Sequence, residues 1–392
     1  MALPNVTINL ENGNLGRIAQ SDDGVAGLIL TGAAVAGKLE LNRVYLINST
    51  RDIAKLGITA ENNPLAHKDL TAFFTETGDG AELNLLVMAQ ATLLSQMCSI
   101  EDGSPLKKLI TYAKGRIRLV GFNRLPPAEY SADTTETGID KDVVTAATAA
   151  QSVGDSFAKK VMPFRCLVPA AGWGGKTDKL YKPREGSTNR VGFVMACDDQ
   201  VNKTAAVGQM LGRAAKYPVN YSLARVKSGV IATEGWLTNG ETPEECDAML
   251  DLLDEAGYII YRSFPKKNGY YPNDDPMGAP LSDDYSNLNY GRVVDKAMII
   301  AYTTFVEEIQ DDIETDDDGN IPQEMCSYYE GRINNAVASA MQGEISNFTS
   351  YVDPAQNVLS TRLMTVSCKI RPRGCLRDII VNLGFENPAI KQ

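Results

Sequence analysis

The sequence predicts an α/β protein with βαβ-type domains, whose sheets are parallel or mixed, followed by a C-terminal α+β domain. Two observations carry this prediction. Through most of the chain, short apolar runs alternate with amphipathic segments of about 8 to 15 residues, the pattern of strands connected by helices. From about residue 286 onward, two consecutive helical segments precede the next strand-like runs. With 392 residues the chain is too long for one ordinary core, so we expect two or three domains.

The first α/β domain is predicted over residues 23–125, where the alternation is clearest. Its strands are expected at VAGLILTG, RVYLINS, AELNLLVMA and RIRLVGF. Its helices are expected at STRDIAKLG, NPLAHKDLTAFFTET and SPLKKLITYAK. Strands separated by helices in this order favour a mainly parallel sheet.

A connecting segment, residues 126–160, separates this domain from a second α/β block. It opens with Pro126 and Pro127, becomes polar, and ends in a long helix over about 141–160. The two prolines interrupt any strand or helix at this point. We therefore expect a boundary here.

The second α/β block is predicted over residues 161–285. Strands are expected at FRCLVPA, VGFVMAC, ARVKSGVIA and YIIYRSF, and helices at NKTAAVGQMLGRAAKY and TPEECDAMLDLLDEAG. The last of these helices is expected to begin at Thr242, because Pro243 suits a first turn and Gly257 a helix end. A long polar loop closes the block.

The last block is a helical core domain, residues 286–362, followed by C-terminal strands and an arm over 363–392. We expect a helix over 290–310, an acidic turn, and a second helix from about Gln323 to Met341. The strand-like runs after it are RLMTVSCKI and CLRDIIVNLGF.

Both ends of the chain carry runs that suit strand pairing with another molecule. The N-terminal arm, residues 1–22, contains the alternating run VTINL ahead of NGNLG. Strands this close to a terminus pair with a neighbour as readily as with their own chain. The candidate pairing residues are Val6, Ile8, Leu10, Val366, Cys368, Ile370, Ile379 and Val381.

The composition argues against several functional classes. The net charge of −11 comes without a basic stripe in the body of the chain, which makes nucleic acid an unsuitable partner. No apolar run approaches the roughly 18 residues of a membrane span, and the N-terminus lacks signal-peptide features. Seven cysteines without a CxxC pair fit a reduced, cytoplasmic origin. The single histidine, His67, is expected on an amphipathic helix and not in catalysis.

One motif makes an enzyme the alternative hypothesis. LVPAAGWGGKT, residues 167–177, follows a strand and ends like a phosphate-binding loop, and Asp198 or Asp199 follows a later strand as a magnesium-binding aspartate would. The alternative is therefore a doubly wound nucleotide-binding protein that uses the Gly174–Thr177 loop, with Lys176. However, the P-loop pattern requires glycine where Ala170 stands. Pro183 also comes where the phosphate-binding helix should continue. We expect no enzyme and no cofactor.

The segment VEEIQDDIETDDDGNIP, residues 306–322, is unusually acidic. It holds eight Asp and Glu residues and no Lys or Arg. If the preceding helix continued to residue 310, its last turn would carry acids that oppose the helix macrodipole and repel each other four residues apart. The DDDGN part resembles a fragment of a calcium loop but lacks the glutamate that would complete it, and an ordinary tight turn is the simpler interpretation.

The two ends of the chain resemble contractile tail sheath proteins of myophages and related contractile injection systems. The N-terminal resemblance lies in GVAGLILTGAA, RVYLINSTRDIAKLG and LTAFFTETGDGAELNLLVMA. The C-terminal resemblance lies in GRVVDKAMIIAYTTFVEE, YEGRINNAVASAMQGEISNF and VSCKIRPRGCLRDIIVNLGF. Gly291-Arg292 stands where a doubled arginine is common in the family, and residues 126–240 match no pattern of it.

The resemblance implies a structural subunit without enzymatic activity. Such subunits form hexameric rings around a tail tube, stay linked through exchanged arms, and contract without nucleotide hydrolysis to drive the tube through a target envelope. The implied partners are further copies of the chain, a tail tube protein, and baseplate and tail terminator proteins, with no insertion into a membrane. Assembly would take place in the bacterial cytoplasm, and the product would be part of a virion tail or an injection particle.

Charged residues supply candidates for the contacts between subunits and with the tube. The acidic segment could meet the basic C-terminal run KIRPRGCLRD of a neighbour, which holds Lys369, Arg371, Arg373 and Arg377 against Asp378 alone, or it could be a solvated turn that only aids solubility. The residues of this charge patch are Glu307, Glu308, Asp311, Asp312, Lys369, Arg371 and Arg373. The resemblance points to Arg292, Lys296 and Arg332 as tube-facing candidates, and the alternative for them is an ion pair within the chain, such as Arg292 with Asp295.

Overall fold

The N-terminal domain is built on one seven-stranded sheet. The structure, a computed structural model, describes residues 22–385. The strand order is β10-β6-β5-β4-β1-β3-β2, and all neighbours are parallel except β2 and β3, which are antiparallel. The strands are β1 (Ala26–Gly32), β2 (Val44–Ile47), β3 (Leu83–Ala89), β4 (Leu119–Asn123), β5 (Arg165–Pro169), β6 (Val191–Val194) and β10 (Tyr258–Ile259).

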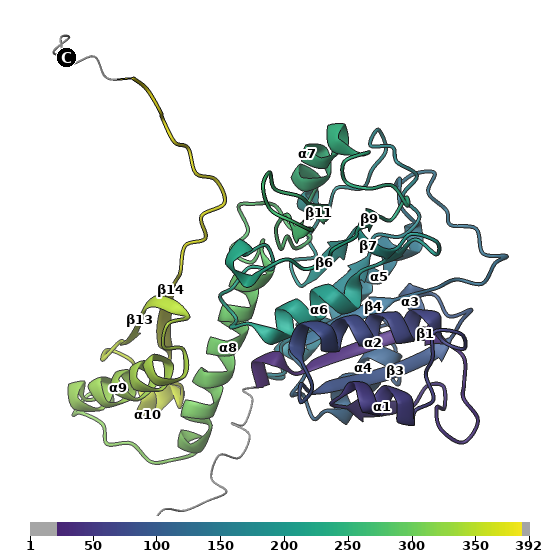
Figure 1. Cartoon of the computed structure of the whole chain (residues 1–392). Coiled ribbons are helices and arrows are strands. Elements are labelled where there is room, and N and C mark those ends of the chain that lie inside the picture. Colours follow the sequence, from purple (N-terminus) through teal and green to yellow (C-terminus); the bar gives the residue numbers. More distant parts are fainter. Residues whose placement is uncertain (1–21, 386–392) are drawn as a thin grey trace, which may run out of the picture.

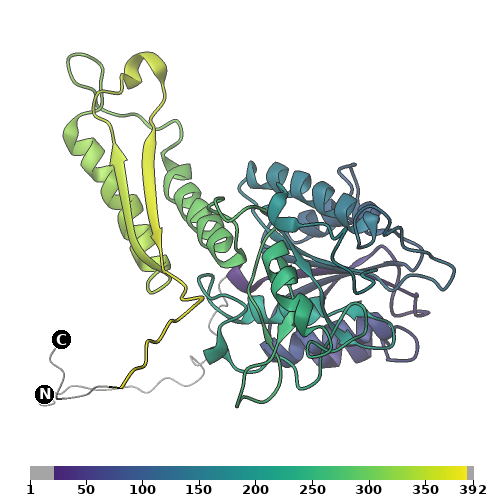
Figure 2. The same ribbon diagram turned by 90° about the horizontal axis from the view of Figure 1, so that it is seen from above.

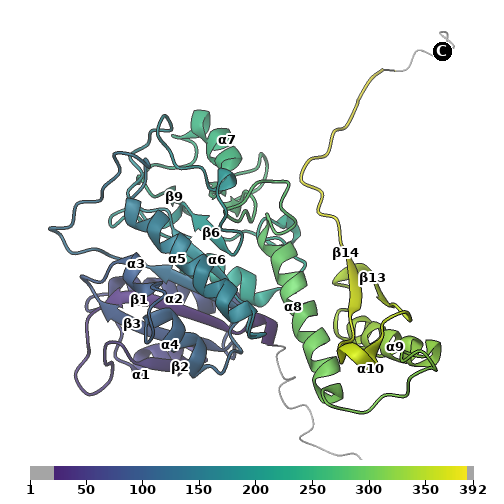
Figure 3. The ribbon, with the colours of Figure 1, turned by 180° about the vertical axis from the view of Figure 1, so that it is seen from behind.

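Helices cover both faces of this sheet, as Figures 1 and 3 show from opposite sides. Helices α2 and α6 pack on one face, and α3, α4 and α5 pack on the other. In β1, Leu28 and Leu30 enter the first of these two cores and Ile29 enters the second, which is why the strand is a continuous apolar run. The helices are α1 (Thr50–Lys55), α2 (Pro64–Thr77), α3 (Leu94–Met97), α4 (Pro105–Tyr112), α5 (Lys141–Ala158), α6 (Val207–Lys216) and α7 (Asp247–Ala256).

The two expected α/β blocks are halves of this single sheet and not separate domains. Strand β4 of the first block pairs in parallel with β5 of the second, with Leu119 opposite Arg165. The segment after Pro126 and Pro127 is therefore the crossover connection that carries α5 across the sheet, and the expected boundary was wrong. Prolines stop a strand, but they do not say whether the next strand joins the same sheet.

Two local predictions in the second block also differ from the structure. ARVKSGVIA forms no strand but a short 3₁₀ turn (Val226–Ser228) and a single bridge between Ala232 and Tyr270. The helix expected from Thr242 begins at Asp247, one turn later. Thr242 and Glu245 still cap each other's backbone amides, so the capping signal is real but belongs to the turn that precedes the helix. Small sheets flank the main one: β7 (Ala196–Asp199) with β8 (Thr204–Ala205) and β9 (Trp236–Leu237), and β11 (Tyr261–Arg262) with β12 (Tyr271–Pro272).

A small C-terminal domain projects from the N-terminal domain on one long helix, α8 (Figure 2). In this domain α9 packs against α8 and against a two-stranded antiparallel sheet, with side chains of all three elements in one cluster. Strand β13 was missed in the sequence because its residues ISNFTSYV are mostly polar. The elements are α8 (Leu288–Phe305), η4 (Val306–Glu308), α9 (Gln323–Ala340), β13 (Ile345–Val352), α10 (Val358–Thr361) and β14 (Val366–Pro372).

The acidic segment does not lie on a helix, contrary to the expectation from the sequence. Helix α8 ends at Phe305, a 3₁₀ turn follows, and Gln310 takes a left-handed conformation with φ of 71°. Glu307 and Asp311 are therefore not neighbours on a helical face. The chain avoids the repulsion and the unfavourable macrodipole contact by ending the helix before the acids begin.

A buried ion pair joins the two domains where α8 passes the sheet. Arg165 of β5 is 1% exposed, and its Nε and Nη2 donate to the two carboxylate oxygens of Asp295 of α8 at 2.7 and 3.1 Å. The guanidinium also donates to the carbonyl oxygens of Asn189 and Gly291 at 2.8 and 3.1 Å. A β-carbon at Gly291 would lie 2.4 Å from Cζ of Arg165. A larger residue here would therefore displace the Arg165 guanidinium from its contact with Asp295.

A second buried carboxylate, Asp275, holds the start of α8. It accepts from Oγ of Ser222 at 2.8 Å and from the backbone N–H of Asn289 at 3.0 Å, so it satisfies one of the free amides of the first turn. Burial raises the pKa of Asp275 to about 7, and the neighbouring Asp274 carboxylate acts in the same direction. The start of α8 is thus fixed by the N-terminal domain.

Replacing Arg165 with methionine should destabilise the protein strongly. The change leaves Asp295 buried without its main partner, and such a loss typically costs about 3–5 kcal/mol of unfolding free energy. The measurement is urea denaturation followed by circular dichroism. K182A serves as the control, because the Lys182–Glu185 pair is exposed and should contribute less than about 1 kcal/mol. A loss of similar size in both variants would contradict the assignment of Arg165 as the joint between the domains.

Asp275 should make the protein less stable as the pH rises from about 4 to about 7. Its pKa is 3.8 in the unfolded reference and about 7 in the folded chain, so in this range only the folded state holds the proton. This stabilising contribution is complete below about pH 4 and is lost as the pH passes 7. D275N should remove a slope of up to about 1.4 kcal/mol per pH unit from the unfolding free energy, measured by urea titrations at several pH values. The exposed-loop variant D178N should keep the wild-type slope, and an unchanged slope in D275N would contradict the prediction.

Candidate assembly interface

The two-stranded sheet of the C-terminal domain offers unpaired strand edges. Among the described residues, β13 pairs with β14 alone, so the outer side of each strand has no strand partner. Val366 and Ile370 of β14 contact the apolar clusters of the domain, whereas Cys368 is exposed. Cys368 was expected on the same face as Val366 and Ile370 but is not buried with them, so the alternation expected from the sequence is present only in part. An unpaired strand edge is a template for a strand from another molecule.

The chain after β14 is extended and does not pack against its own domain. Ile379 and Val381 are 75% and 77% exposed, and Leu383 is 96% exposed. Residues 375–385, expected as a second strand, form none within the described chain, and Figure 1 shows the end of this stretch leading away from both domains. Exposed apolar side chains in this density are typical of an interaction site. The expected N-terminal pairing residues Val6, Ile8 and Leu10 lie outside the described residues.

The acidic and basic parts of the predicted charge patch lie on different elements of the C-terminal domain. The acidic turn adjoins α10, because Gly319 accepts the backbone N–H of Leu359. The basic end adjoins the end of α9, because Nη1 of Arg373 donates to the carbonyl oxygen of Gly343 at 2.8 Å. Glu308 lies beside the middle of α9, where it pairs with Arg332, and Lys369 lies opposite Thr349 in the middle of β13. Within the described chain no ion pair joins the acidic residues of the patch, Glu307, Glu308, Asp311 and Asp312, to its basic residues, Lys369, Arg371 and Arg373.

The three tube-facing candidates have different surroundings. Arg292 is 4% exposed and donates from Nη2 to the backbone oxygen of Asp23 at 3.1 Å, and burial lowers its pKa to about 10. It does not reach the surface of the described chain, so this candidate disagrees with the structure. Its expected partner Asp295 is instead taken by Arg165.

Lys296 and Arg332 form ion pairs within the chain. Nζ of Lys296 lies 2.7 Å from carboxylate oxygens of both Asp23 and Glu344. Arg332 pairs with Glu308 and lies over the ring of Tyr328. Arg332 is the more accessible of the two, with a side chain that is 29% exposed against 14% for Lys296.

The structure does not support the phosphate-binding alternative. After the Gly174–Thr177 loop comes a short 3₁₀ turn at Pro183 and no helix that could bind a phosphate at its N-terminus. The carbonyl oxygen of Lys176 accepts from the indole N–H of Trp173, which is buried and holds the loop as a packed turn.

The candidate magnesium ligand Asp198 is used in an internal ion pair. Its carboxylate is bound to Nζ of Lys68, which also lies 3.1 Å from Oδ1 of Asp69. Burial raises the pKa of Asp198 to about 6. Burial alone would lower the pKa of Lys68, but the two carboxylates raise it above its ordinary value. The cluster is a structural contact between α2 and β7.

The remaining residues that were weighed as functional candidates in the sequence have structural roles. His67 is half-buried on α2, and Leu65, Leu70, Phe73 and Phe74 of this helix face the core as expected. The DDDGN segment is a tight turn in which Gly319 has φ of 80°. Within residues 22–385, no group of three or more His, Cys, Asp or Glu side chains is placed to hold a metal ion. In the same part of the chain, no helix is long and apolar enough to cross a membrane.

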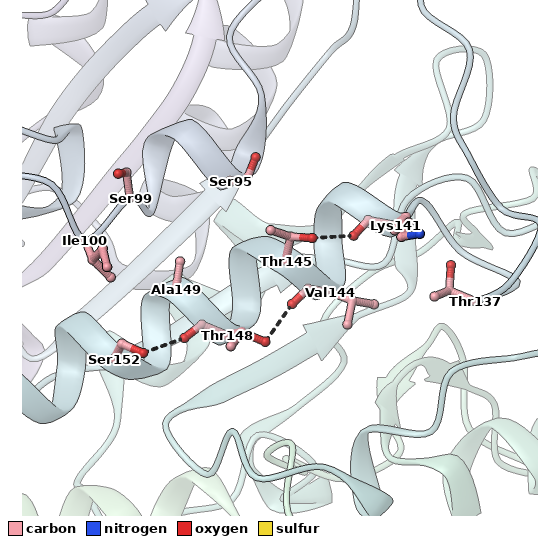
Figure 4. Close-up of a pocket in the computed structure, with 10 residues that line it drawn as sticks. All are labelled: Ser95, Ser99, Ile100, Thr137, Lys141, Val144, Thr145, Thr148, Ala149 and Ser152. Carbon is pink, nitrogen blue, oxygen red and sulfur yellow. Dashed lines mark hydrogen bonds between the residues drawn. The ribbon is translucent and has the colours of Figure 1, made fainter.

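A shallow groove of about 600 Å³ runs along the exposed side of α5 and was not predicted (Figure 4). Its hydroxyl groups are used within the helix, since Thr145, Thr148 and Ser152 donate to carbonyl oxygens one turn earlier. Lys141 lies at one end of the groove, and Ile100 lies across from the helix. The groove has no group placed for catalysis.

The sequence placed Arg377 in the basic run expected to meet a neighbour, and its contact within the chain was not predicted. This arm residue pairs with Asp254 and Asp274 of the N-terminal domain. The density of carboxylates around TPEECDAMLDLLDEAG was an available signal, because the stretch from Glu241 to Glu255 holds seven acids and no Lys or Arg.

Two family models together cover nearly the whole chain. Residues 3–276 match the DUF2586 N-terminal domain, and residues 284–390 match the DUF2586 C-terminal domain. The division between the models falls just before α8, where the structure also divides. No curated protein sequence matches the chain.

Solved structures of contractile sheath proteins share the fold. The contracted helical sheath of the anti-feeding prophage (AFP) has a TM-score of 0.63 at 14% identity, over 98% of this chain and 100% of that one. The contracted PVC sheath complex of an extracellular contractile injection system has 0.56 at 13%, over 98% of both chains. A sheath tail protein from Desulfitobacterium hafniense has 0.53 at 10%, over 94% and 100%.

The resemblance to contractile sheath proteins is thereby confirmed for the fold. Mixed α/β architecture, the C-terminal α+β domain and the order of the two agree with these structures. The chain belongs to the DUF2586 family and has the fold of contractile sheath proteins.

Proposed function

We propose that this chain is the structural subunit of a contractile tail sheath. It polymerises as hexameric rings around a tail tube and contracts, without nucleotide hydrolysis, to drive the tube through a target envelope. The observation that carries the proposal is the incomplete sheet of the C-terminal domain, which among the described residues has an unpaired edge on each side, next to an exposed apolar arm of the same chain. The sheet lacks strand partners at its edges, and the arm lacks a sheet to join. Within one chain the described arm does not pair with this sheet.

Strand addition between copies is the interaction that suits these parts. An arm that adds to the edge of β13 or β14 would satisfy the outward backbone groups of that strand, and its alternate side chains would be buried. Ile379 and Val381 lie two residues apart, so they would face the same side of an added strand. The N-terminal residues Val6, Ile8 and Leu10 have the same spacing and would serve the second edge.

Charge complementarity would set the register of this pairing. Within the described residues of a single chain no ion pair joins the acidic residues to the basic ones, and Glu308 is paired with Arg332 instead. Contacts between the acidic turn of one copy and the basic end of another would accelerate docking more than they would tighten it. Arg332 and Lys296 are the remaining candidates for contact with a tube protein.

The further partners and the place of assembly follow from the proposed role. The ends of a sheath need a baseplate and a tail terminator, and one of the similar solved structures is an AFP baseplate assembly. Assembly in the bacterial cytoplasm and incorporation in a virion tail or injection particle complete the proposal.

Negative-stain electron microscopy of the purified protein, alone and with a candidate tube protein, tests the function. Hollow tubes or stacked rings are expected, and I379D/V381D should abolish them because charged residues would have to be buried at the added strand. V201D is the control, since Val201 is 88% exposed in a loop of the N-terminal domain and should not affect assembly. Uniform small particles under both conditions, from a chain with an unchanged circular dichroism spectrum, would refute the sheath function.

Reversing the basic end should slow assembly in a salt-dependent way. R371E/R373E places acids opposite the acidic turn of the next copy, and we expect an assembly rate about tenfold lower at low salt, measured by light scattering. At 1 M salt the Debye length is about 3 Å and the difference should disappear. Adding D311K/D312K to the same chain should restore the rate at low salt. Equal rates for all variants at low salt would leave the acidic turn with a role in solubility alone.

A further inference from the structure

The C-terminal arm returns to the N-terminal domain at one residue. Strand β14 ends at Pro372, and five residues later Arg377 contacts the N-terminal domain. Its Nη2 is paired with Asp254, and its Nη1 donates to Oδ2 of Asp274 at 3.2 Å. Beyond Arg377 the described side chains are almost fully exposed, with Ile380 at 87% and Phe385 at 109%. Arg377 is therefore the last point at which the described arm touches its own chain.

The two carboxylates are positioned by hydrogen bonds from residues outside the arm. The side-chain amide of Asn273 donates to Oδ1 of Asp254 at 2.7 Å, and that of Asn287 donates to Oδ1 of Asp274 at 3.0 Å. In each case the amide occupies one oxygen, and the other oxygen, Oδ2, faces Arg377. The side chains of Asp254 and Asp274 are 22% and 14% exposed, so the site is partly shielded from water.

The surroundings of the site favour a cation. Asp254 lies in the last turn of α7, where a negative charge opposes the helix macrodipole. α7 and the turn before it carry seven acids and no Lys or Arg. Arg184 is a further cation near the pair, at 3.7 Å from Asp274, and it is buried. A guanidinium that spans both carboxylates relieves this excess of negative charge.

We propose that Asp254 and Asp274 form an anchor site for Arg377, which fixes the base of the C-terminal arm on its own N-terminal domain. The chain then crosses between the domains twice, outward through α8 and back through residues 373–377. The segment after Arg377 is then the part of the C-terminal arm that can reach a second copy. The last step rests on the proposed sheath function, whereas the anchor itself does not.

An anchored arm would bind a neighbour with a smaller loss of conformational freedom. A segment that is tied at both ends of a five-residue stretch samples fewer directions than one that is tied only at Pro372. The anchor also adjoins the start of α8, since Asp274 and Asp275 are consecutive and share the donor Asn287. The direction of the arm is thereby tied to the joint between the domains.

Label mobility on the dilute, unassembled full chain tests the anchor. Cys368 and Cys375 are the exposed cysteines of the described chain, so C368S leaves Cys375, two residues before Arg377, as the site for a nitroxide. R377A should shift the spin-resonance spectrum toward the mobile form, with the ratio of anchored to free label about fivefold lower, as expected for a loss of about 1 kcal/mol. D254N/D274N should give the same shift from the other side of the contact. Salt at 1 M should give it in the wild type.

D378N is the matched control, because it removes a charge from the next, exposed residue and should leave the label as in the wild type. Identical spectra for the wild type and R377A, or an equal shift in D378N, would overturn the anchor. The measurement does not depend on polymerisation. A chain that shows the shift but forms no tubes would support the anchor and contradict the sheath function. A chain that forms tubes but shows no shift would support the sheath function and contradict the anchor.

Discussion

The contact between Arg165 and Asp295 is the constraint on which the rest of the architecture depends. It joins the middle of the main sheet to the helix that carries the whole C-terminal domain, and it is almost completely buried. A buried ion pair gains little overall, because desolvation of both charges opposes their attraction. The ion pair instead fixes the relative orientation of the two elements, since each nitrogen of the guanidinium donates to a defined acceptor. The direction of α8, and with it the position of the unpaired strands, is set at this point.

The large buried core and the proposed assembly surface lie in different parts of the chain. The N-terminal domain buries apolar residues on both faces of its sheet, and it pairs charged groups at depth, as Lys68 with Asp69 and Asp198. The C-terminal domain has two small apolar clusters and, within the described residues, a sheet of two strands. Two strands are marginal on their own, and further strands from neighbours would complete the domain. A sheet left open in this way is what the proposed sheath function requires.

The elements of the main sheet were largely predictable, but their grouping was not. Continuous apolar runs such as that of β1 indicate strands covered on both faces, and the helices on either side showed their capping and periodic signals. The pairing of β4 with β5 joins strands that are separated by the long connection from Arg124 to Phe164, and no local pattern specifies such a contact. The same limit explains β13, whose polar residues resemble a loop until α9 covers one of its faces.

By itself the sequence determined the class of the fold, the strand-like character of residues 366–372, the exposed apolar arm and the excess of acid near residue 310. These features follow from periodicity and composition, which are properties of short stretches of the sequence. Only the tertiary structure decided which charged side chains are buried or paired within the chain. Folding buried Arg292, paired Asp295 with Arg165 and Arg332 with Glu308, and brought Arg377 to Asp254 and Asp274. Ion pairs form between residues that folding brings together from 24 to more than 100 positions apart, so their partners depend on packing and cannot be read from spacing.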